Sequence, residues 1–401
     1  MKTEAVEEFV AQQEFLPFAR PSITEAEKAA VLAVLDSGWL TTGPRVQEFE
    51  EAFASFVGTP YALAVNSATA ALHLALEAIG VGPGDEVIVP TWTFAASAEV
   101  IAHCGATPVL VDIEPRSLNA SDDAVIAALT PRTRAYIAVH FAGLPTDLEA
   151  VATELEQRGI SIIEHAAHAF PSRIGPQRRS VGTIGRAGAY SFYATKTITT
   201  GEGGMLVTAD PAVAERARVM SLHGISRDAW KRYTEAGSWY YEIEAAGFKY
   251  NLTDLAAALG LVQLSRANEL HEKRRWLSRR YGELLHKSVI RDVIELPQGI
   301  EDEAHAWHLF VLRLQLERLG CDRGAVIEAL RERGIGTSVH FIPLHLHPYY
   351  REHFGTTPSR YPVASREYER VISLPLWPDM TDSDVQRVVS ELESVVGPAI
   401  L

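Results

Sequence analysis

Five short β-rich segments alternate with helical patterns between residues 61 and 165, and this alternation limits the fold more than any other feature of the sequence. The segments are YALAVN (61–66), EVIVP (86–90), TPVLVDI (107–113), RAYIAV (134–139) and SIIEH (161–165). Apolar runs of this length, joined by helical stretches, are typical of buried parallel strands with right-handed crossovers. The sequence therefore predicts an α/β fold with a mostly parallel central sheet and helices on both of its faces.

Two helices are expected before this run. Ser22 and Glu25 form the pattern of a capping box at the start of a helix over residues 22–36, and Gly38 is placed to end it. A second helix is expected over residues 45–56. Within the run, helices are expected to begin near Ala68 and to cover residues 95–103, 122–129 and 147–157.

The pattern changes after Gly204. A polar and aromatic stretch over residues 221–250 has no clear periodicity, and one long helix is expected from Thr253 to Leu285. A strand-like segment (307–314) and helices at 322–333 and 382–396 then indicate a smaller α+β unit. We therefore predict an N-terminal arm (1–18), a large α/β domain (19–265) and a smaller C-terminal α+β domain (266–401).

Composition excludes several classes of protein. The chain has 401 residues, 47% of them apolar, as in ordinary globular proteins, and its net charge of −14 argues against a general nucleic-acid or anionic-membrane binder. The N-terminus lacks the apolar core of a signal peptide, and no apolar run approaches the ~20 residues of a membrane span. The two cysteines, Cys104 and Cys321, provide neither a disulfide framework nor a metal cluster. A cytoplasmic location is expected.

The segment SFYATKTITTGEGG (191–204) is the most informative for chemistry. Lys196 stands there among small and apolar residues before a glycine-rich turn. Burial disfavours the charged form of a lysine, and a neutral amine can form a Schiff base with a carbonyl compound. A lone lysine is more often an exposed loop residue, but the surrounding pattern favours a reactive amine.

The same segment resembles the lysine motif of the DegT/DnrJ/EryC1/StrS sugar aminotransferases. Further similar segments follow in the family's order and cover nearly the whole chain: GWLTTGP (38–44), NSATAALHLAL (66–76), GDEVIVPTWTF (84–94), GAYSFYATK (188–196), KYNLTDLAAALGLVQL (249–264) and HAWHLF (305–310). The resemblance implies the pyridoxal-phosphate (PLP) transferase fold of type I, with PLP attached to Lys196. The segments FLPFARP, KYNLTD and SLPLWPDMT most resemble the branch of the family that makes UDP-4-amino-4-deoxy-L-arabinose.

A phosphate site is expected where the first strand hands over to a helix. Free N–H groups at a helix N-terminus bind anions, although Ser67 or Thr69 can equally be a simple helix cap. The resemblance implies that Ala68, Thr69 and Ser191 hold the cofactor phosphate. It also implies that the ring of Trp92 stacks on the pyridine face, although a core position is the alternative.

The segment EHAAH (164–168) departs from the family pattern. Family members have an aspartate facing the pyridine nitrogen where this chain has His165, and His168 matches the residue near the cofactor's 3-hydroxyl. The spacing of Glu164 and the two histidines fits no zinc motif, and no third ligand is evident, so we expect no metal. Histidine cannot supply the anionic charge of aspartate.

The resemblance also implies partner and substrate contacts. Asn251 matches the residue that reaches across a homodimer to the partner's cofactor phosphate, although it is equally a candidate turn residue. His340 matches a substrate-side histidine, and we place Tyr193 and Trp230 on the same side. The basic and aromatic positions Arg178, Arg179, Lys231, Arg232 and Trp239 are candidates for the diphosphate and base, or are solvated surface residues.

The predicted function is therefore a PLP-dependent aminotransferase that acts on a nucleoside-diphosphate keto sugar. The amino donor is expected to be an amino acid, glutamate by preference, and the acceptor carbon C4 of a keto-pentose or 4-keto-6-deoxyhexose. One alternative is a PLP-dependent sugar dehydratase, a branch that replaces the lysine with histidine. Another is a non-catalytic regulatory protein that retains the fold.

Overall fold

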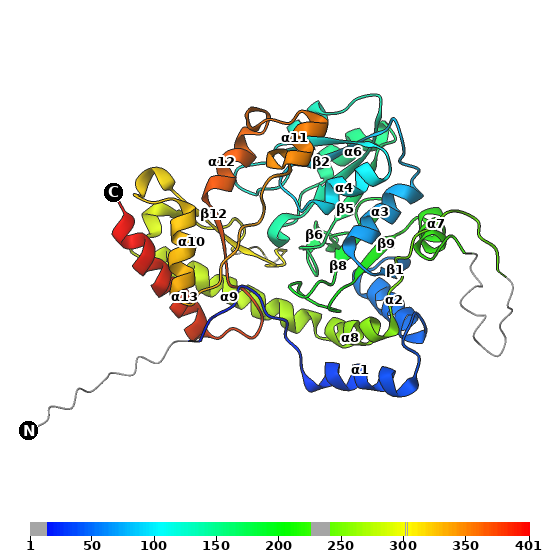
Figure 1. The fold of residues 1–401 in the computed structure, drawn as a ribbon, viewed down its shortest axis with the longest axis horizontal. Helices are drawn as coiled ribbons and strands as arrows, with labels where there is room; N and C mark the ends of the chain where they lie inside the picture. The colour runs from blue at the N-terminus through cyan, green and yellow to red at the C-terminus, as the bar shows by residue number, and fades with distance from the viewer. Residues whose placement is uncertain (1–13, 226–240, 301, 303) are drawn as a thin grey trace, which may run out of the picture.

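A seven-stranded sheet forms the centre of the protein in the computed structural model, which describes residues 14–225, 241–300, 302 and 304–401. The strands lie in the order β1-β9-β8-β5-β4-β2-β3 (Figure 1). All run parallel except β9, which is antiparallel to both of its neighbours. The predicted fold class is thereby confirmed. The bounds of these strands are β1 Tyr61–Val65, β2 Glu86–Pro90, β3 Thr107–Val111, β4 Thr133–Val139, β5 Ser161–His165, β8 Ala187–Ser191 and β9 Gly204–Thr208.

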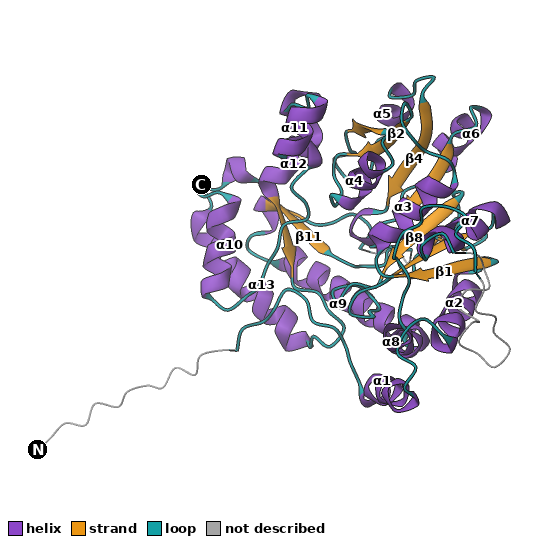
Figure 2. Cartoon of the chain, turned by 45° about the vertical axis from the view of Figure 1, so that its right-hand side comes forward, coloured by secondary structure: helices purple, strands orange, loops and turns teal. Residues whose placement is uncertain are grey.

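Helices cover both faces of the sheet (Figure 2). On one face pack α3 (Ala68–Ala78), α4 (Ala96–His103) and α7 (Pro211–Ser221). On the other face pack α2 (Pro44–Val57), α5 (Asp122–Ala127), α6 (Glu149–Gln157) and α8 (Asp254–Ser265). Because side chains alternate along a strand, Ile163 belongs to the core of the first face and its neighbour Ile162 to that of the second.

The cap of the first helix lies two residues later than its sequence pattern predicts. Helix α1 covers Glu25–Ser37, and its capping box is formed by Thr24 and Glu27. The predicted pair, Ser22 and Glu25, is therefore wrong. The Ser22 hydroxyl instead donates to Asp379, 357 residues away, at 2.9 Å. A distant contact thus decides which of two equivalent local patterns caps the helix.

The long predicted helix over 253–285 is two helices. Helix α8 ends at Ser265 and α9 covers Ala267–Lys287, with Arg266 between them. Nothing in the local sequence signals this break. The Arg266 guanidinium is paired at 2.6 Å with the buried carboxylate of Glu27 on α1, and this tertiary contact lies at the junction.

The C-terminal part of the chain forms a three-stranded antiparallel sheet covered by helices. Its core joins α9 to this sheet and also takes in Leu16 from the N-terminal segment. The division of the chain at residues 18 and 265 stays a prediction. The elements are β10 Ile294–Glu295, β11 Phe310–Leu314, β12 Val371–Leu374, α10 Arg323–Glu332, α11 Pro348–Phe354, α12 Pro362–Arg370 and α13 Asp382–Val396; a separate hairpin pairs β6 Arg173–Ile174 with β7 Arg179–Ser180.

Strands β8 and β9 were not among the predicted strands, and they frame the lysine motif. The loop between them, residues 192–203, contains Lys196 and emerges at the same sheet edge at which the parallel strands β1, β2 and β5 end. Ligands of open α/β sheets bind at this carboxyl edge. Among the helices that the structure describes, none is both long enough and apolar enough to cross a bilayer.

Candidate active site

A cavity of about 300 Å³ lies at the carboxyl edge of the central sheet, within the size range of small-molecule sites. Segments that follow β1, β2, β5 and β8 all contribute side chains to it, because parallel strands end at one edge. Residues from the C-terminal part close the other side. Of the predicted site residues, Ala68, Thr69, His165, His168, Ser191, Tyr193, Lys196 and His340 line this cavity.

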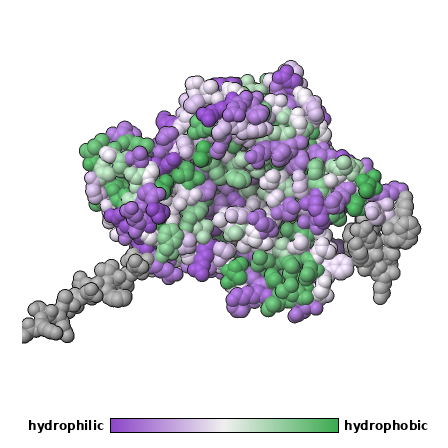
Figure 3. Space-filling view, in the orientation of Figure 1, coloured by the Kyte–Doolittle hydropathy of each residue, from purple (hydrophilic) through white to green (hydrophobic). Residues whose placement is uncertain are grey.

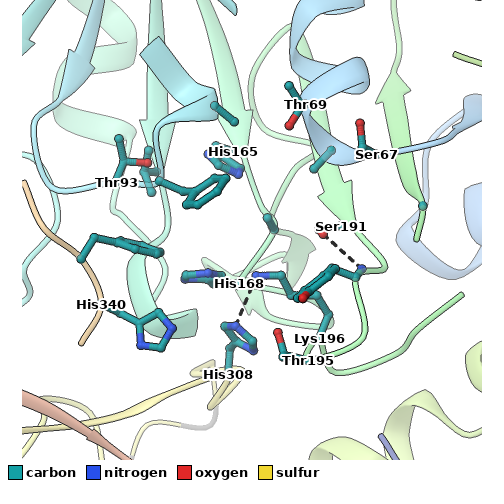
Figure 4. A pocket seen from close by; sticks show the side chains of 18 of the residues that line it. Ser67, Thr69, Thr93, His165, His168, Ser191, Thr195, Lys196, His308 and His340 are labelled. Carbon is teal, nitrogen blue, oxygen red and sulfur yellow. Dashed lines mark hydrogen bonds between the residues drawn. The ribbon is translucent and has the colours of Figure 1, made fainter. Parts of the chain in front are cut away.

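Lys196 extends into the cavity from the β8–β9 loop (Figure 4). Its backbone N–H donates to the carbonyl of Tyr193 at 2.9 Å, which fixes the turn that bears it. Burial, and secondarily the positive charge of Arg274, lower the pKa of the Lys196 ammonium from 10.5 to about 7. Near neutral pH much of this lysine is therefore a free amine, the form that attacks carbonyl carbon.

The N-terminus of α3 borders the cavity, which Ser67, Ala68 and Thr69 help to line. The Ser67 hydroxyl accepts the N–H of Ala70 at 3.0 Å and caps the helix. The N–H groups of Ala68 and Thr69 have no acceptor within the helix because they lie in its first turn. Gly204 passes so close that a Cβ there would lie 2.4 Å from the Ser67 carbonyl carbon. Only glycine permits this approach, which brings Ser191, on the strand that pairs with Gly204, to the same cavity.

His165 ends β5 and faces the cavity from within the protein. Its Nδ1 lies 2.8 Å from the Ser97 hydroxyl. Burial, with smaller effects of Lys196 and His140, lowers the pKa of His165 to about 3, so the imidazole is neutral. The adjacent Glu164 points away from the cavity and accepts the N–H groups of Gly182, Ile184 and Gly185 at 2.6–2.8 Å.

Three more imidazoles surround Lys196. His308 Nε2 lies 3.3 Å from the Lys196 Nζ, and the ring centroids of His168 and His308 are 4.3 Å apart. His340 donates to or accepts from the Ser373 hydroxyl at 2.9 Å. Burial lowers the pKa of all three histidines, and the charge of Lys196 lowers them further. The cavity therefore presents neutral imidazoles beside one amine.

The expectation that Trp92 faces the cofactor does not hold in this structure. Trp92 is fully buried in the core, where its ring meets Phe141 edge-on with centroids 6.0 Å apart. Phe94, two residues later, lines the cavity and is 58% exposed. Because β2 ends at Pro90, strand alternation no longer decides which way residues 91–94 point.

Asn251 does not line the cavity of its own chain. Its amide donates to the Thr42 hydroxyl at 2.7 Å, and its side-chain oxygen accepts from Lys249 at 2.5 Å. The neighbouring Tyr250 carbonyl accepts the N–H of Asn66, which places this segment beside the start of α3. Trp230, Lys231, Arg232 and Trp239 lie outside the described residues, and Arg178 and Arg179 lie at the β6–β7 hairpin, away from the cavity lining.

Sequence reasoning missed Phe94, Ser97, Thr93 and His308. The motif HAWHLF, noted for its resemblance, contains His308, and its second histidine was the available signal. Thr93 and Phe94 follow β2, where local periodicity ends, and Ser97 lies in the first turn of α4. In the part of the chain that the structure describes, no three His, Cys, Asp or Glu side chains are grouped to hold a metal ion.

These residues fit a phosphate-bearing aldehyde cofactor. The cavity offers N–H donors at a helix end for the phosphate, an exposed aromatic ring at Phe94, and the buried amine of Lys196. The side chains of His168 and His308 each hold a buried Nδ1 that has no partner among the described residues, as expected of groups that meet a bound molecule. Fold and site together define a PLP-dependent transferase.

Comparison with known proteins agrees with this class. The profile of the DegT/DnrJ/EryC1/StrS aminotransferase family matches residues 21–393, and the chain belongs to this family. It is therefore an enzyme of the PLP-dependent sugar aminotransferases, with pyridoxal phosphate as its cofactor.

Individual relatives match over nearly their full length. The spore coat polysaccharide biosynthesis protein SpsC of Bacillus subtilis is 47% identical over 386 residues, which cover 96% of this chain and 98% of SpsC. The PMP form of the putative sugar aminotransferase Spr1654 from Streptococcus pneumoniae superimposes with a TM-score of 0.87 at 35% identity, covering 94% and 98% of the two chains. Helicobacter pylori PseC, an aminotransferase of pseudoaminic acid biosynthesis, gives 0.88 at 28% identity, covering 96% and 100%.

Proposed function

We propose that this enzyme transfers an amino group from glutamate to a keto sugar linked to a nucleoside diphosphate. The acceptor carbon is C4 of a keto-pentose or of a 4-keto-6-deoxyhexose. The observation that supports amine transfer most directly is the buried, partly neutral amine of Lys196 beside an anion site. The sugar class is supported by the family and by the names of SpsC and PseC, which refer to polysaccharide and pseudoaminic acid synthesis.

In this proposal Lys196 holds the cofactor between turnovers and moves a proton during them. Bound PLP supplies an electron-withdrawing ring that stabilises negative charge on the reacting carbon. Because the Lys196 pKa is about 7, the same amine can accept and return a proton near neutral pH. Ala68, Thr69 and Ser191 hold the phosphate, and His165 faces the pyridine nitrogen. His168 lies near the cofactor's 3-hydroxyl.

The substrate side of the cavity is proposed to include Tyr193 and His340. Tyr193 is 47% exposed at the cavity mouth, and His340 is held by Ser373. A nucleotide bound outside the cavity adds remote binding energy that orients the reacting carbon. The C4 position is supported by the resemblance of FLPFARP, KYNLTD and SLPLWPDMT to the branch that makes UDP-4-amino-4-deoxy-L-arabinose.

We also propose that the enzyme works as a homodimer with shared active sites. Apolar side chains gather on the outer surface of α1, at the bottom of Figure 3, where Leu32 and Leu35 are 57% and 49% exposed. An apolar patch of this kind favours contact with another protein surface. In this dimer, Asn251 of each subunit completes the phosphate site of the other.

Two measurements test the function. Borohydride reduction of the purified enzyme is expected to fix PLP on the peptide that contains Lys196, and labelling of another lysine would contradict its role.

A mass-based screen of nucleotide-linked keto sugars with glutamate is expected to find an amino-sugar product. A free keto sugar converted as well as its nucleotide-linked form would refute the proposed acceptor.

A further inference from the structure

Arg274 on α9 is buried without a carboxylate partner among the described residues. Its side chain is 2% exposed, and Nη1 donates to the carbonyl oxygens of Trp307 and His308, each at 3.3 Å, and of Leu376 at 2.9 Å. Burial lowers the pKa of this guanidinium to about 10, so it stays charged near neutral pH. A buried cation held only by carbonyl dipoles costs free energy, because the charge has lost its contact with water.

The backbone that Arg274 holds is in an unusual conformation. Trp307 has a φ of +52°, a left-handed value that side chains other than glycine rarely adopt. Its ring stacks on His305 with centroids 3.8 Å apart, and its N–H donates to the His305 Nδ1 at 2.9 Å. On either side, the N–H groups of Ala306 and Leu309 donate to the carbonyls of Gly143 and Ala142. The segment 305–309 is thus held from several directions.

This backbone conformation brings the His308 imidazole into contact with the Lys196 side chain. The His308 Nε2 lies 3.3 Å from the lysine Nζ, and the dashed line between these two side chains in Figure 4 marks this contact. Because the imidazole is neutral, its Nε2 accepts a hydrogen bond from the Lys196 Nζ when the imidazole proton is on Nδ1. The Lys196 Nζ can donate to this nitrogen both as an ammonium and as a neutral amine. The hydrogen bond therefore keeps the lysine side chain pointing in one direction within the cavity.

We propose that Arg274 is a positioning residue for Lys196. Its guanidinium holds the Trp307–His308 backbone so that the imidazole of His308 directs the amine. The role of the amine rests on the proposed function, but its reactivity does not require a bound cofactor. If the hydrogen bonds of Arg274 served only to join α9 to the segment before β11, loss of Arg274 would leave the reactivity of Lys196 unchanged.

The lysine is surrounded by other groups that titrate, and any pH profile includes their effects. They come from the end of β5 and the turn after it, from the segments before β11 and after α10, and from α9 and the β8–β9 loop. These groups are His165, His168, His308, His340, Arg274, Glu202 and Tyr193. The four histidines are neutral near pH 7, since burial lowers the pKa of each. Among these groups, Arg274 is the cation that raises the cost of charging Lys196.

The test compares Arg274→Met with the control Arg275→Met in the full-length protein after removal of the cofactor. Arg275 is the adjacent arginine, and it pairs with Glu272 on α9 itself. Acetylation of Lys196 is followed by peptide mass spectrometry from pH 5 to 11. We expect Arg274→Met to label Lys196 about threefold to tenfold more slowly at pH 7, because loss of the nearby charge shifts its titration upward. The control is expected to label like the native protein.

A second variant separates the charge of Arg274 from its hydrogen bonds to the backbone of residues 307 and 308. Arg274→Lys retains a cation but not the planar fork, so amide hydrogen exchange at residues 306–309 is expected to become faster. Labelling of Lys196 at pH 7 is expected to slow, but by less than in Arg274→Met, because the charge remains while the hold on His308 is loosened. Native labelling rates in Arg274→Met overturn the proposal. If that variant does not fold, a native labelling rate of Lys196 in Arg274→Lys beside faster exchange at 306–309 overturns the proposal, because a purely structural contact gives that result, and slower labelling supports it. Failure of PLP to attach to Lys196 would refute the proposed function without altering these results.

Discussion

The Nδ1 atom of His165 lies 2.8 Å from the hydroxyl of Ser97, which in turn lies 2.7 Å from the hydroxyl of Thr93. Each hydroxyl can donate to one neighbour and accept from the other, so this chain of hydrogen bonds suits a neutral imidazole in either tautomer. It leaves Nε2 as the ring nitrogen available to a bound molecule. Since burial lowers the pKa of His165 to about 3, the residue offers a bound cofactor no charge near neutral pH.

Replacing His165 with aspartate is expected to speed the donor half-reaction. A carboxylate at this position stabilises a protonated pyridine nitrogen, which withdraws electrons more strongly than a neutral one. If the change favours the protonated ring by one pKa unit, the rate rises about tenfold. The measurement is stopped-flow absorbance of the bound cofactor after addition of glutamate.

Ser97→Ala is the control for this experiment, because it removes the partner of Nδ1 without adding charge. Its effect on the rate is expected to be smaller than that of His165→Asp. A clear fall in rate for His165→Asp would mean that the neutral imidazole is itself adapted to the reaction.

Phe94 and Trp92 are expected to separate cofactor binding from stability. Phe94→Ala removes an exposed ring from the cavity, so the Kd for PLP should rise about threefold to tenfold with little loss of stability. Trp92→Ala leaves a hole in the core and is expected to lower the free energy of unfolding by about 3–5 kcal/mol. Fluorescence titration with PLP and urea denaturation measure the two quantities. A larger loss of PLP affinity in folded Trp92→Ala than in Phe94→Ala would return the stacking role to Trp92.

Glu27 is expected to make stability depend on acid pH. Its burial raises the pKa, but hydrogen bonds from Thr24, Arg266 and Gln263 together outweigh burial and lower the pKa to about 2. The carboxylate therefore stabilises the fold above pH 4.5, and this contribution is lost as pH falls from about 4.5 to about 2. Glu27→Gln is expected to lower the free energy of unfolding by up to about 3 kcal/mol at pH 7.

Urea denaturation between pH 2.5 and 7 checks this expectation, with the difference between Glu27→Gln and the native protein shrinking as the pH falls. Glu25→Gln is the matched control, because Glu25 lies in the same helical turn and forms only an exposed ion pair with Lys28. Its effect should stay within about 0.5 kcal/mol. A difference for Glu27→Gln that does not change with pH would contradict the account.

Mixed subunits test the shared active site. Asn251→Ala and Lys196→Ala subunits are expected to be poorly active alone. A heterodimer of the two should contain one site with both defects and one with neither, so mixing should restore up to about half of the native activity per heterodimer. Steady-state rates after mixing and refolding provide the measurement. A fully active monomer at working concentration, shown by ultracentrifugation, would end the proposal.

The sequence alone determined the parts of the site that depend on local pattern. The alternation of β-rich and helical segments predicted the parallel sheet, and a parallel sheet brings its strand ends to one edge. Small residues and a glycine-rich turn around Lys196 predicted a buried amine, and its pKa of about 7 agrees. Alternation along β5 likewise explains why Glu164 and His165 point in opposite directions.

Tertiary structure decided what local patterns leave equivalent. Thr24 rather than Ser22 caps α1 because Ser22 bonds to Asp379, and the helical pattern from Thr253 to Leu285 is interrupted where Arg266 meets Glu27. Such contacts join residues more than 200 positions apart, so no window of sequence contains both partners.

The same reason explains the errors within the site. Beyond Pro90 the chain leaves the strand, and packing against Phe141, not spacing, turns Trp92 into the core and leaves Phe94 in the cavity. His308 reaches Lys196 across 112 positions, held by an arginine on a third element. The sequence predicts which side chains can react, because their chemistry is a property of the residue type. Which of them come into contact is decided by tertiary packing, in which distant segments compete for the same space.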